Sequence, residues 1–278
     1  MFLDVSCHEL LGHGSGKMLV ERDDGTLNFN PAETTNPFTG KSPASWYKKG
    51  ETWQTVFGEL SNGWEECRAE CIALYDACLP EVAEILLPGK EANWQGVMEC
   101  TWTNMVYGGI KGMMLYNPDT KKWGQAHCRA RFFIYKWLQK KGFVQINRYD
   151  RDGKPYFDFT LKKDEIKTKG FELIGEALKH MQVMKAEANI TEGKPWFEEW
   201  TSPDADDLEL RDMVLAWRMP RGLLLQAETV IKGGDVEYVA YEETFEGIIL
   251  STLHHYQYNF DNVLVEYMKC RHLFRNRK

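Results

Sequence analysis

Two histidines bracket a glutamate near the start of the chain, in the run His8-Glu9-Leu10-Leu11-Gly12-His13. Neutral imidazole nitrogens are good ligands for zinc, and a glutamate between them is placed to take a proton from a water bound to the metal. Core packing gives no reason to select this combination in an otherwise apolar stretch. The run therefore predicts a hydrolytic zinc centre, with His8 and His13 as ligands and Glu9 as general base.

The spacing of the two histidines restricts the backbone that carries them. They are five residues apart, one more than in the common H-E-x-x-H signature, whose histidines share one helical face. On a regular helix of about 3.6 residues per turn, five residues correspond to a rotation of roughly 140°. Both rings can reach one ion only if the helix is locally widened or ends here, and Gly12, Gly14 and Gly16 permit either. Two unrelated helical histidines remain the alternative on spacing alone.

A third ligand is available in the run Trp64-Glu65-Glu66-Cys67-Arg68-Ala69-Glu70. On a helix Glu66 and Glu70 share a face, so one can bind the metal while the other accepts a hydrogen bond from a ligand histidine. Two histidines, one glutamate and an open fourth position are typical of a catalytic zinc site, whereas closed structural sites use four protein ligands. The alternative for this run is an acidic helix surface that Arg68 stabilises.

Together the two runs resemble the dipeptidyl peptidase III family of zinc aminopeptidases, which is marked by the motifs H-E-L-L-G-H and E-E-C-R-A-E/D. The resemblance implies one Zn²⁺ ion held by His8, His13 and Glu66, with Glu65 and Glu70 behind these ligands. It also implies release of dipeptides from the N-terminus of short peptides. The resemblance covers most of the chain and continues through Gly14-Ser15-Gly16-Lys17, Ser45-Trp46-Tyr47, Gly50-Glu51-Thr52-Trp53, Gln125-Ala126-His127 and Arg129-Ala130-Arg131.

Further site residues follow from the resemblance. His127 matches a family histidine that faces the zinc and steadies the oxyanion, and Arg221 matches a cleft arginine that contacts substrate carbonyl oxygens. Arg131, one helical turn after His127, could bind a substrate carbonyl or carboxylate, or pair with an internal acid. The family has an acid after G-E-T-W that supports a ligand histidine. Here that position is Gln54, whose amide can still accept a hydrogen bond.

Composition limits the remaining possibilities. With 278 residues, 43% of them hydrophobic, the chain can bury one large core with or without a small appendage. A net charge of −7 without a dominant basic patch argues against a nucleic-acid partner, and the apolar runs are shorter than the ~20 residues of a membrane span.

Seven cysteines without disulfide or C-x-x-C spacing, and no secretory signal, predict a reducing, cytoplasmic setting. Cys67, Cys71 and Cys78 are expected to be small buried hydrophobes.

The expected fold is mainly α with small β hairpins. We expect the helical zinc-binding lobe of a two-lobe metallopeptidase over residues 1–217 and a short β-rich segment over 218–278 that returns to the other lobe. Gly108, Gly109 and Gly112 should let helices approach closely. Helices are predicted over residues 50–78, 91–116, 121–141, 163–189, 195–201, 204–217 and 251–272, and hairpins around the turns at 23–26 and 150–154.

The expected partners are short peptides. Some family members carry an acidic E-T-G-E peptide that docks a Kelch-repeat adaptor, but this chain has Phe38-Thr39-Gly40-Lys41, which lacks both acids, so that partner is not expected. The region that precedes the zinc motif in the family, and that grips the free N-terminus of the substrate, is missing from these residues. The alternative function is therefore a truncated zinc-binding fragment or interaction module without efficient catalysis. A general endopeptidase with an open cleft is a third possibility.

Overall fold

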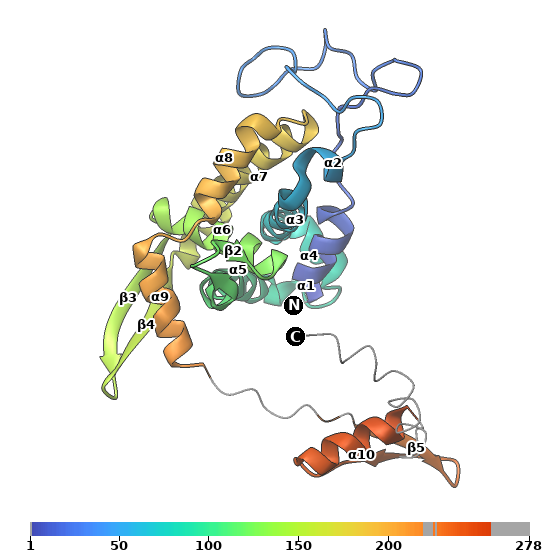
Figure 1. Ribbon diagram of the computed structural model, residues 1–278, viewed down its shortest axis with the longest axis vertical. Coiled ribbons are helices and arrows are strands. Elements are labelled where there is room, and N and C mark those ends of the chain that lie inside the picture. Colours follow the sequence, from blue (N-terminus) through green and yellow to red (C-terminus); the bar gives the residue numbers. More distant parts are fainter. Residues whose placement is uncertain (1, 219–224, 226, 257–278) are drawn as a thin grey trace, which may run out of the picture. The chain divides into compact units, whose positions relative to one another are not determined.

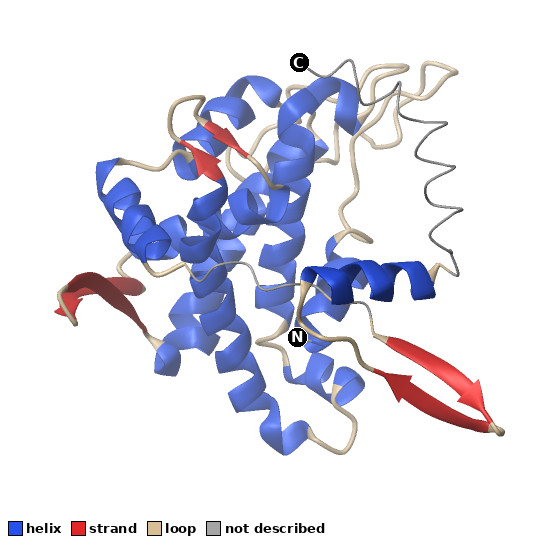
Figure 2. Ribbon diagram, turned by 60° about the horizontal axis from the view of Figure 1, so that its bottom comes forward, coloured by secondary structure: helices blue, strands red, loops and turns tan. Residues whose placement is uncertain are grey.

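The computed structural model describes residues 2–218, 225 and 227–256. The chain divides into two compact units, Met1–Arg218 and Met219–Lys278, so the division falls one residue beyond the expected boundary. Helices dominate the first unit, and its strands occur only as short hairpins (Figure 2). The expectation of a mainly α fold with small hairpins is therefore confirmed.

The first unit begins at the histidine motif and ends with a helix that packs on a hairpin (Figure 1). Its elements are α1 (Phe2–Ser6), the π-helix η1 (Cys7–Gly12), α2 (Trp53–Phe57), the 3₁₀ turn η2 (Gly58–Leu60), α3 (Ser61–Asp76), α4 (Pro80–Leu86), η3 (Glu91–Asn93), α5 (Trp94–Gly112), η4 (Met113–Leu115), β1 (Tyr116–Asn117), β2 (Lys122–Trp123), α6 (Ala126–Lys140), β3 (Val144–Arg151), β4 (Lys154–Leu161), η5 (Lys163–Glu165), the π-helix η6 (Ile166–Gly170), α7 (Phe171–Ala186), α8 (Ile190–Thr201) and α9 (Ala205–Ala216).

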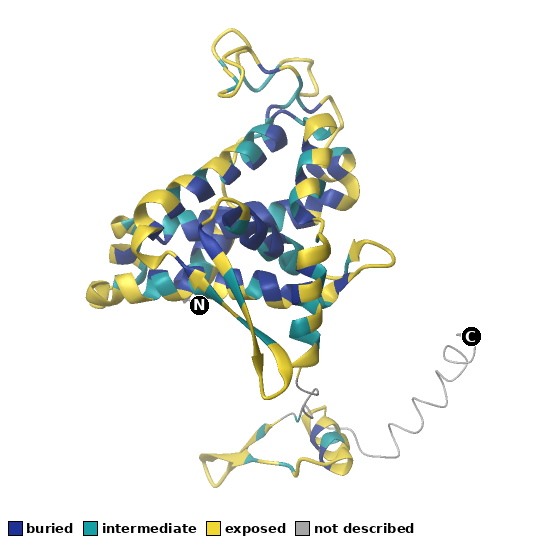
Figure 3. Ribbon diagram, turned by 90° about the vertical axis from the view of Figure 1, so that its left-hand side faces the viewer, coloured by how far each residue is buried: buried dark blue, intermediate teal, exposed yellow. Residues whose placement is uncertain are grey.

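Helix α3 is at the centre of the core and packs against η1, α6 and α7 (Figures 1 and 3). Its Trp64 is fully buried, with ring centroids 4.9 Å from Phe197 of α8 and 5.2 Å from Phe57 of α2. Cys67 and Cys71 lie on the same buried helix and Cys78 just after it, so the expectation that these three cysteines are buried is confirmed. The helix that carries the second motif is thus held on several sides by apolar contacts.

Close packing of α5 on α6 depends on glycine. A Cβ atom at Gly109 would collide with the backbone carbonyl of Arg131, and one at Gly112 would come within 3.1 Å of the Cβ of Cys128. The prediction that these glycines let helices approach is confirmed. The contact places the α6 segment with His127 and Arg131 beside α5 and α3.

The start of α6 differs from the predicted helix over 121–141. The side chain of Asn117 accepts hydrogen bonds from the backbone of Asp119 and Thr120, which forms a turn and joins β1 to β2. Lys121 then has a φ of 54°, which a right-handed helix cannot include. The helix therefore begins at Ala126, where the Gln125 side chain accepts a hydrogen bond from the backbone of Cys128.

The two predicted hairpins in this unit have different outcomes. Strands β3 and β4 pair over their full length around Asp152 and Gly153, whose φ angles of 55° and 74° suit a two-residue hairpin turn. Around residues 23–26 the pairing is only a single bridge, between Glu21 and Leu27. Helix α8 begins at Ile190, earlier than the predicted residue 195, because the Asn189 side chain caps it.

The second unit contains a hairpin and one helix. Strands β5 (Glu228–Lys232) and β6 (Asp235–Val239) pair in an antiparallel manner, and α10 (Phe245–His255) follows, capped by Thr244. The rest of the helix predicted over 251–272 lies outside the described residues, and so does Arg221. Within the described ranges, none of the helices combines the length and hydropathy that crossing a bilayer requires.

Candidate metal centre

The five-residue spacing of the histidines is accommodated by the π-helix η1. Its hydrogen bonds span five residues, and the last one joins the backbone N–H of His13 to the carbonyl of His8 at 3.0 Å. Each π-helical turn contains about one residue more than an α-helical turn, so residues five apart return to one face. The locally widened helix that the sequence required is confirmed.

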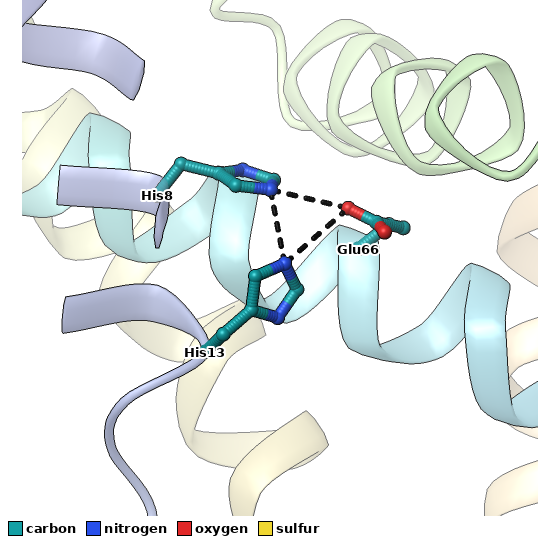
Figure 4. A group of neighbouring side chains, drawn as sticks. All are labelled: His8, His13 and Glu66. Carbon is teal, nitrogen blue, oxygen red and sulfur yellow. Dashed lines mark hydrogen bonds and ion pairs between the residues drawn. The ribbon is translucent and has the colours of Figure 1, made fainter. Parts of the chain in front are cut away.

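Three ligand atoms converge between η1 and α3. The Nε2 atoms of His8 and His13 are 3.1 Å apart, and Oε2 of Glu66 lies 3.1 Å from the first and 3.7 Å from the second (Figure 4). His8 is buried, Glu66 is half-buried and His13 is exposed. Tetrahedral zinc with bonds of about 2.0–2.1 Å would place its ligand atoms roughly 3.3 Å apart. The structure thus brings the three predicted ligands to a separation that suits one ion.

The proton positions on the two rings also favour a cation. Nδ1 of His13 lies 3.3 Å from Oε1 of Glu65, and Nδ1 of His8 lies 3.7 Å from Oε2 of Glu70. These carboxylates favour the proton on Nδ1, which leaves the lone pairs of both Nε2 atoms facing Glu66. Oε2 of Glu66 is itself buried, and its neighbours are the ring nitrogens of His8 at 3.1 Å and His127 at 3.2 Å. When both rings are neutral, two Nε2 lone pairs and one carboxylate oxygen face one another, which is the arrangement that a divalent metal ion fits.

A proton competes with the metal at this position. Burial lowers the pKa of His8, but the carboxylates of Glu66 and Glu70 outweigh it and raise the pKa to about 10 in the absence of metal. A bound ion would have to displace that proton, because a ligating imidazole must be neutral.

Glu65 is held in place by two cations. It accepts hydrogen bonds from Arg68 at 2.5 and 3.1 Å and from Lys185 at 2.6 Å. Burial opposes ionisation of Glu65, yet these two partners lower its pKa to about 2. Glu65 therefore stays charged and can fix the His13 ring. Lys185 has no local signal in the sequence, because it lies 120 residues from Glu65.

Glu70 is almost fully buried and is paired with Arg131. Nε of Arg131 donates to Oε1 of Glu70 at 2.6 Å, and only 1% of the Glu70 side chain is exposed. Despite the burial, hydrogen bonds from His127 and His8 and the Arg131 charge lower the pKa of Glu70 to about 2. Of the two roles left open for Arg131, the structure shows pairing with an internal acid.

The remaining predicted site residues are His127, Glu9 and Gln54, and they differ in how they relate to the metal centre. Nδ1 of His127 lies 3.2 Å from Oε2 of Glu66, and Glu9 is exposed on η1, between the two histidines in the sequence. Gln54 is exposed on α2, and no hydrogen bond joins its side chain to either ligand histidine in the described part of the chain. The carboxylates that do approach the histidine Nδ1 atoms are Glu65 and Glu70.

Two contacts fix the histidine motif to α3. Arg68 is fully buried and donates to the carbonyl of Gly12 at 2.5 Å and to the hydroxyl of Ser15 at 3.3 Å. A Cβ atom on Gly12 would come within 2.7 Å of the Cβ of Ala69, so the two backbones approach as closely as glycine allows. The sequence indicates Arg68 only as a residue that stabilises an acidic helix surface, whereas in the structure it joins the two motifs.

Comparison with known proteins gives the family. A model of peptidase family M49 matches residues 1–256. The chain belongs to peptidase family M49. This family consists of metallopeptidases, and in this M49 chain His8, His13 and Glu66 form a possible metal site.

The M49 chain is similar to proteins named dipeptidyl peptidase 3. It is 39% identical over 252 residues to the protein of Nematostella vectensis, covering 90% of this chain and 34% of the relative. It is 36% identical over 257 residues to the human protein, covering 90% and 35%. A solved DPP III from Caldithrix abyssi aligns with 77% of this chain and 32% of its own at 15% identity and a TM-score of 0.45. The chain thus spans about a third of the length of the curated relatives it matches.

Changing Glu70 to glutamine in this M49 chain is expected to weaken zinc binding about 10–100-fold, because the neutral amide no longer stabilises the His8 Nδ1–H. Competition with a fluorescent zinc chelator measures the affinity. The matched control is Glu172→Gln on α7, which changes an exposed glutamate that pairs with Lys169 and should leave the affinity unchanged. Equal affinities for Glu70→Gln and the parent chain would remove Glu70 from the support of the metal centre.

Changing Gly12 to alanine is expected to destabilise the metal-free chain by about 1–3 kcal/mol, because the added methyl group overlaps Ala69. Urea unfolding measures this effect. Gly96→Ala on α5 is the control: its Cβ would meet nothing within 4 Å, and alanine in a helix should stabilise by about 0.5–1 kcal/mol. If both variants gain stability, the close contact between η1 and α3 does not exist in solution.

Proposed function

We propose that this chain carries the zinc centre of a peptidase that releases dipeptides from the N-terminus of short peptides. The observation that carries the proposal is the convergence of two imidazole Nε2 atoms and a carboxylate oxygen to within 3.1–3.7 Å of one another. Nitrogen and oxygen ligands in a set of three, with room for a further ligand, fit zinc in a hydrolytic site. The names of the relatives support the choice of substrate.

Zinc, when bound, would polarise a peptide carbonyl and make water a stronger nucleophile at neutral pH. The chain supplies the proton transfer through Glu9, which is exposed, follows the ligand His8 directly and is not held by an ion pair among the described residues. Its carboxylate takes a proton from the attacking water and passes it to the nitrogen of the leaving amine. The C–N bond breaks, and the products are a free dipeptide with a new carboxylate and a shortened peptide with a new amino terminus.

His127 is suited to stabilise the negative charge that develops on the carbonyl oxygen. The hydrogen bond to Glu70, together with the Glu66 charge, raises the pKa of His127 despite its partial burial. The ring therefore carries a proton over a wider pH range and can donate it in a hydrogen bond to the oxyanion. Donors of this type typically contribute about 3–4 kcal/mol to transition-state binding.

The same proposal includes the cellular compartment in which the chain acts. The six cysteines of the described residues are all free, and four of them are buried. Free thiols persist in reducing compartments. Together with the peptide substrate, this supports a cytoplasmic enzyme.

A second candidate function is favoured by the length of the chain. Since it spans about a third of its curated relatives, residues that bind the substrate in those proteins need not all have counterparts here. The alternative is a chain that binds zinc without efficient catalysis.

The test is hydrolysis of a dipeptidyl-arylamide by the purified chain. We expect release of the arylamine, its loss when a chelator removes the metal, and its return when zinc is added back. Release that persists in chelator would contradict a metal-dependent mechanism. A folded chain with one bound zinc ion and no release would instead establish the alternative, metal binding without catalysis.

A further inference from the structure

A cavity of about 540 Å³ lies beside the metal centre in the first unit. It is bounded by the first turn of α3, the β1–β2 hairpin, the start of α6 and the end of α8. Residues from all four elements line it, among them Asn62, Trp123, Gln125, Arg129 and Thr201. The mechanism proposed above uses none of these side chains.

Arg129 contributes a guanidinium group to the lining of the cavity. Its Nε and Nη2 atoms donate to the hydroxyl of Thr201 at 3.0 and 2.9 Å, and its Cζ lies 4.9 Å from the centre of the Phe197 ring. Among the described residues no carboxylate forms an ion pair with Arg129, and burial lowers its pKa. A partly desolvated charge without a partner is costly, and an anion in the cavity would offset that cost.

The charges around the cavity select the type of anion. Lys121 and Lys122 add two cations to Arg129, while Glu59 and Glu198 add two carboxylates. The carboxylate of Glu198 lies 4.0 Å from Lys194, and its charge also acts on Arg129, whose pKa it raises. The lining therefore has one net positive charge, which suits a single carboxylate better than a phosphate group. Guanidinium groups bind carboxylates through two parallel hydrogen bonds.

The cavity adjoins the residues that surround the metal centre. Asn62 precedes Glu66 by four residues on α3, so both lie on one face of that helix. Gln125 precedes His127 by two residues at the start of α6. The metal centre and the cavity are therefore built on neighbouring turns of the same two helices, α3 and α6.

We propose that this cavity binds a carboxylate of the peptide substrate and that Arg129 recognises it. The inference rests on the proposed peptidase function and adds a preference within it. The carboxylate can come from the C-terminus of a short peptide or from an acidic side chain. Arg129 would form a bidentate contact with either one.

Four tetrapeptides separate these two sources. They share the first three residues and end in Glu or Gln, each with a free or an amidated C-terminus. Hydrolysis by the zinc-loaded chain gives kcat/KM, and calorimetry with the zinc-loaded Glu9→Gln variant gives Kd without turnover. We expect peptides with the recognised carboxylate to bind about tenfold more tightly than the amidated Gln peptide. A preference that follows the free C-terminus identifies the first source, and one that follows Glu identifies the second.

Variants of Arg129 test the residue itself. Arg129→Met should remove the preference between charged and neutral peptides, and Arg129→Lys should restore part of it, because the charge returns without the planar fork. The control Arg148→Met changes an arginine of β3 that pairs with Asp206, and it should keep the full preference. The ratio between peptides is the readout, since a general loss of stability would lower binding of all four alike.

The outcomes separate this inference from the proposed function. Equal binding and equal chelator-sensitive hydrolysis of all four peptides would overturn the carboxylate site and leave the peptidase function intact. A preference that Arg129→Met retains would also overturn it. Discrimination in binding without any hydrolysis would support the carboxylate site and contradict the peptidase function.

Discussion

Replacing Glu9 with glutamine is expected to lower kcat by about 100–10,000-fold while the chain still binds one zinc ion. The amide cannot accept the proton of the attacking water, but the three ligand atoms come from His8, His13 and Glu66 and are unchanged. Hydrolysis of a dipeptidyl-arylamide measures the rate. Metal analysis of the dialysed protein measures the zinc content.

The control for this variant is Glu33→Gln, which changes an exposed glutamate in the loop before α2. It should retain both the parent rate and one zinc ion. A Glu9→Gln chain with the parent kcat would show that another group accepts the proton. A chain that loses its zinc would show that Glu9 contributes to binding the metal.

Replacing Arg68 with methionine is expected to reduce the free energy of unfolding of the metal-free chain by about 3–5 kcal/mol. The change leaves the buried carbonyl of Gly12 without its donor and removes one of the two cations that face Glu65. Because Arg68 joins η1 to α3, zinc affinity should fall as well. Urea unfolding and competition with a zinc chelator measure the two effects.

Arg148→Met is the matched control for the same substitution at the surface. Arg148 and Asp206 form an exposed pair at 2.8 Å, and such pairs contribute about 0–1 kcal/mol. If the two variants unfold at the same urea concentration, Arg68 has no special role in joining the motifs.

The sequence predicted the metal centre in part because the chemistry is local there. The spacing of His8 and His13 required a widened helix, and the structure contains a π-helix at that place. Periodicity put Glu66 and Glu70 on one face but could not decide which of them meets the histidines. That depends on how η1 crosses α3, and the crossing is set by the contact between Gly12 and Ala69.

Contacts between segments that lie far apart in the sequence cannot be predicted from local patterns. Lys185 reaches Glu65 from α7, and Arg131 reaches Glu70 from α6, but no local pattern indicates either pair. The predicted start of α6 was wrong because the Asn117 side chain closes a turn with its neighbours instead of capping a helix. An asparagine side chain can cap a helix or accept the hydrogen bonds of a turn, and the sequence alone does not decide between the two. Here it accepts two hydrogen bonds of a turn.

The π-helix also bears on how this kind of site could have arisen. A π-turn is what remains when one residue is inserted into an α-helix and the flanking hydrogen bonds are kept. Without Leu11 the run would read H-E-L-G-H, with its histidines four residues apart as in the common zinc signature. A single-codon insertion thus separates the two motifs. The π-helical turn accommodates the additional residue, so both histidine ligands remain on one face of the helix.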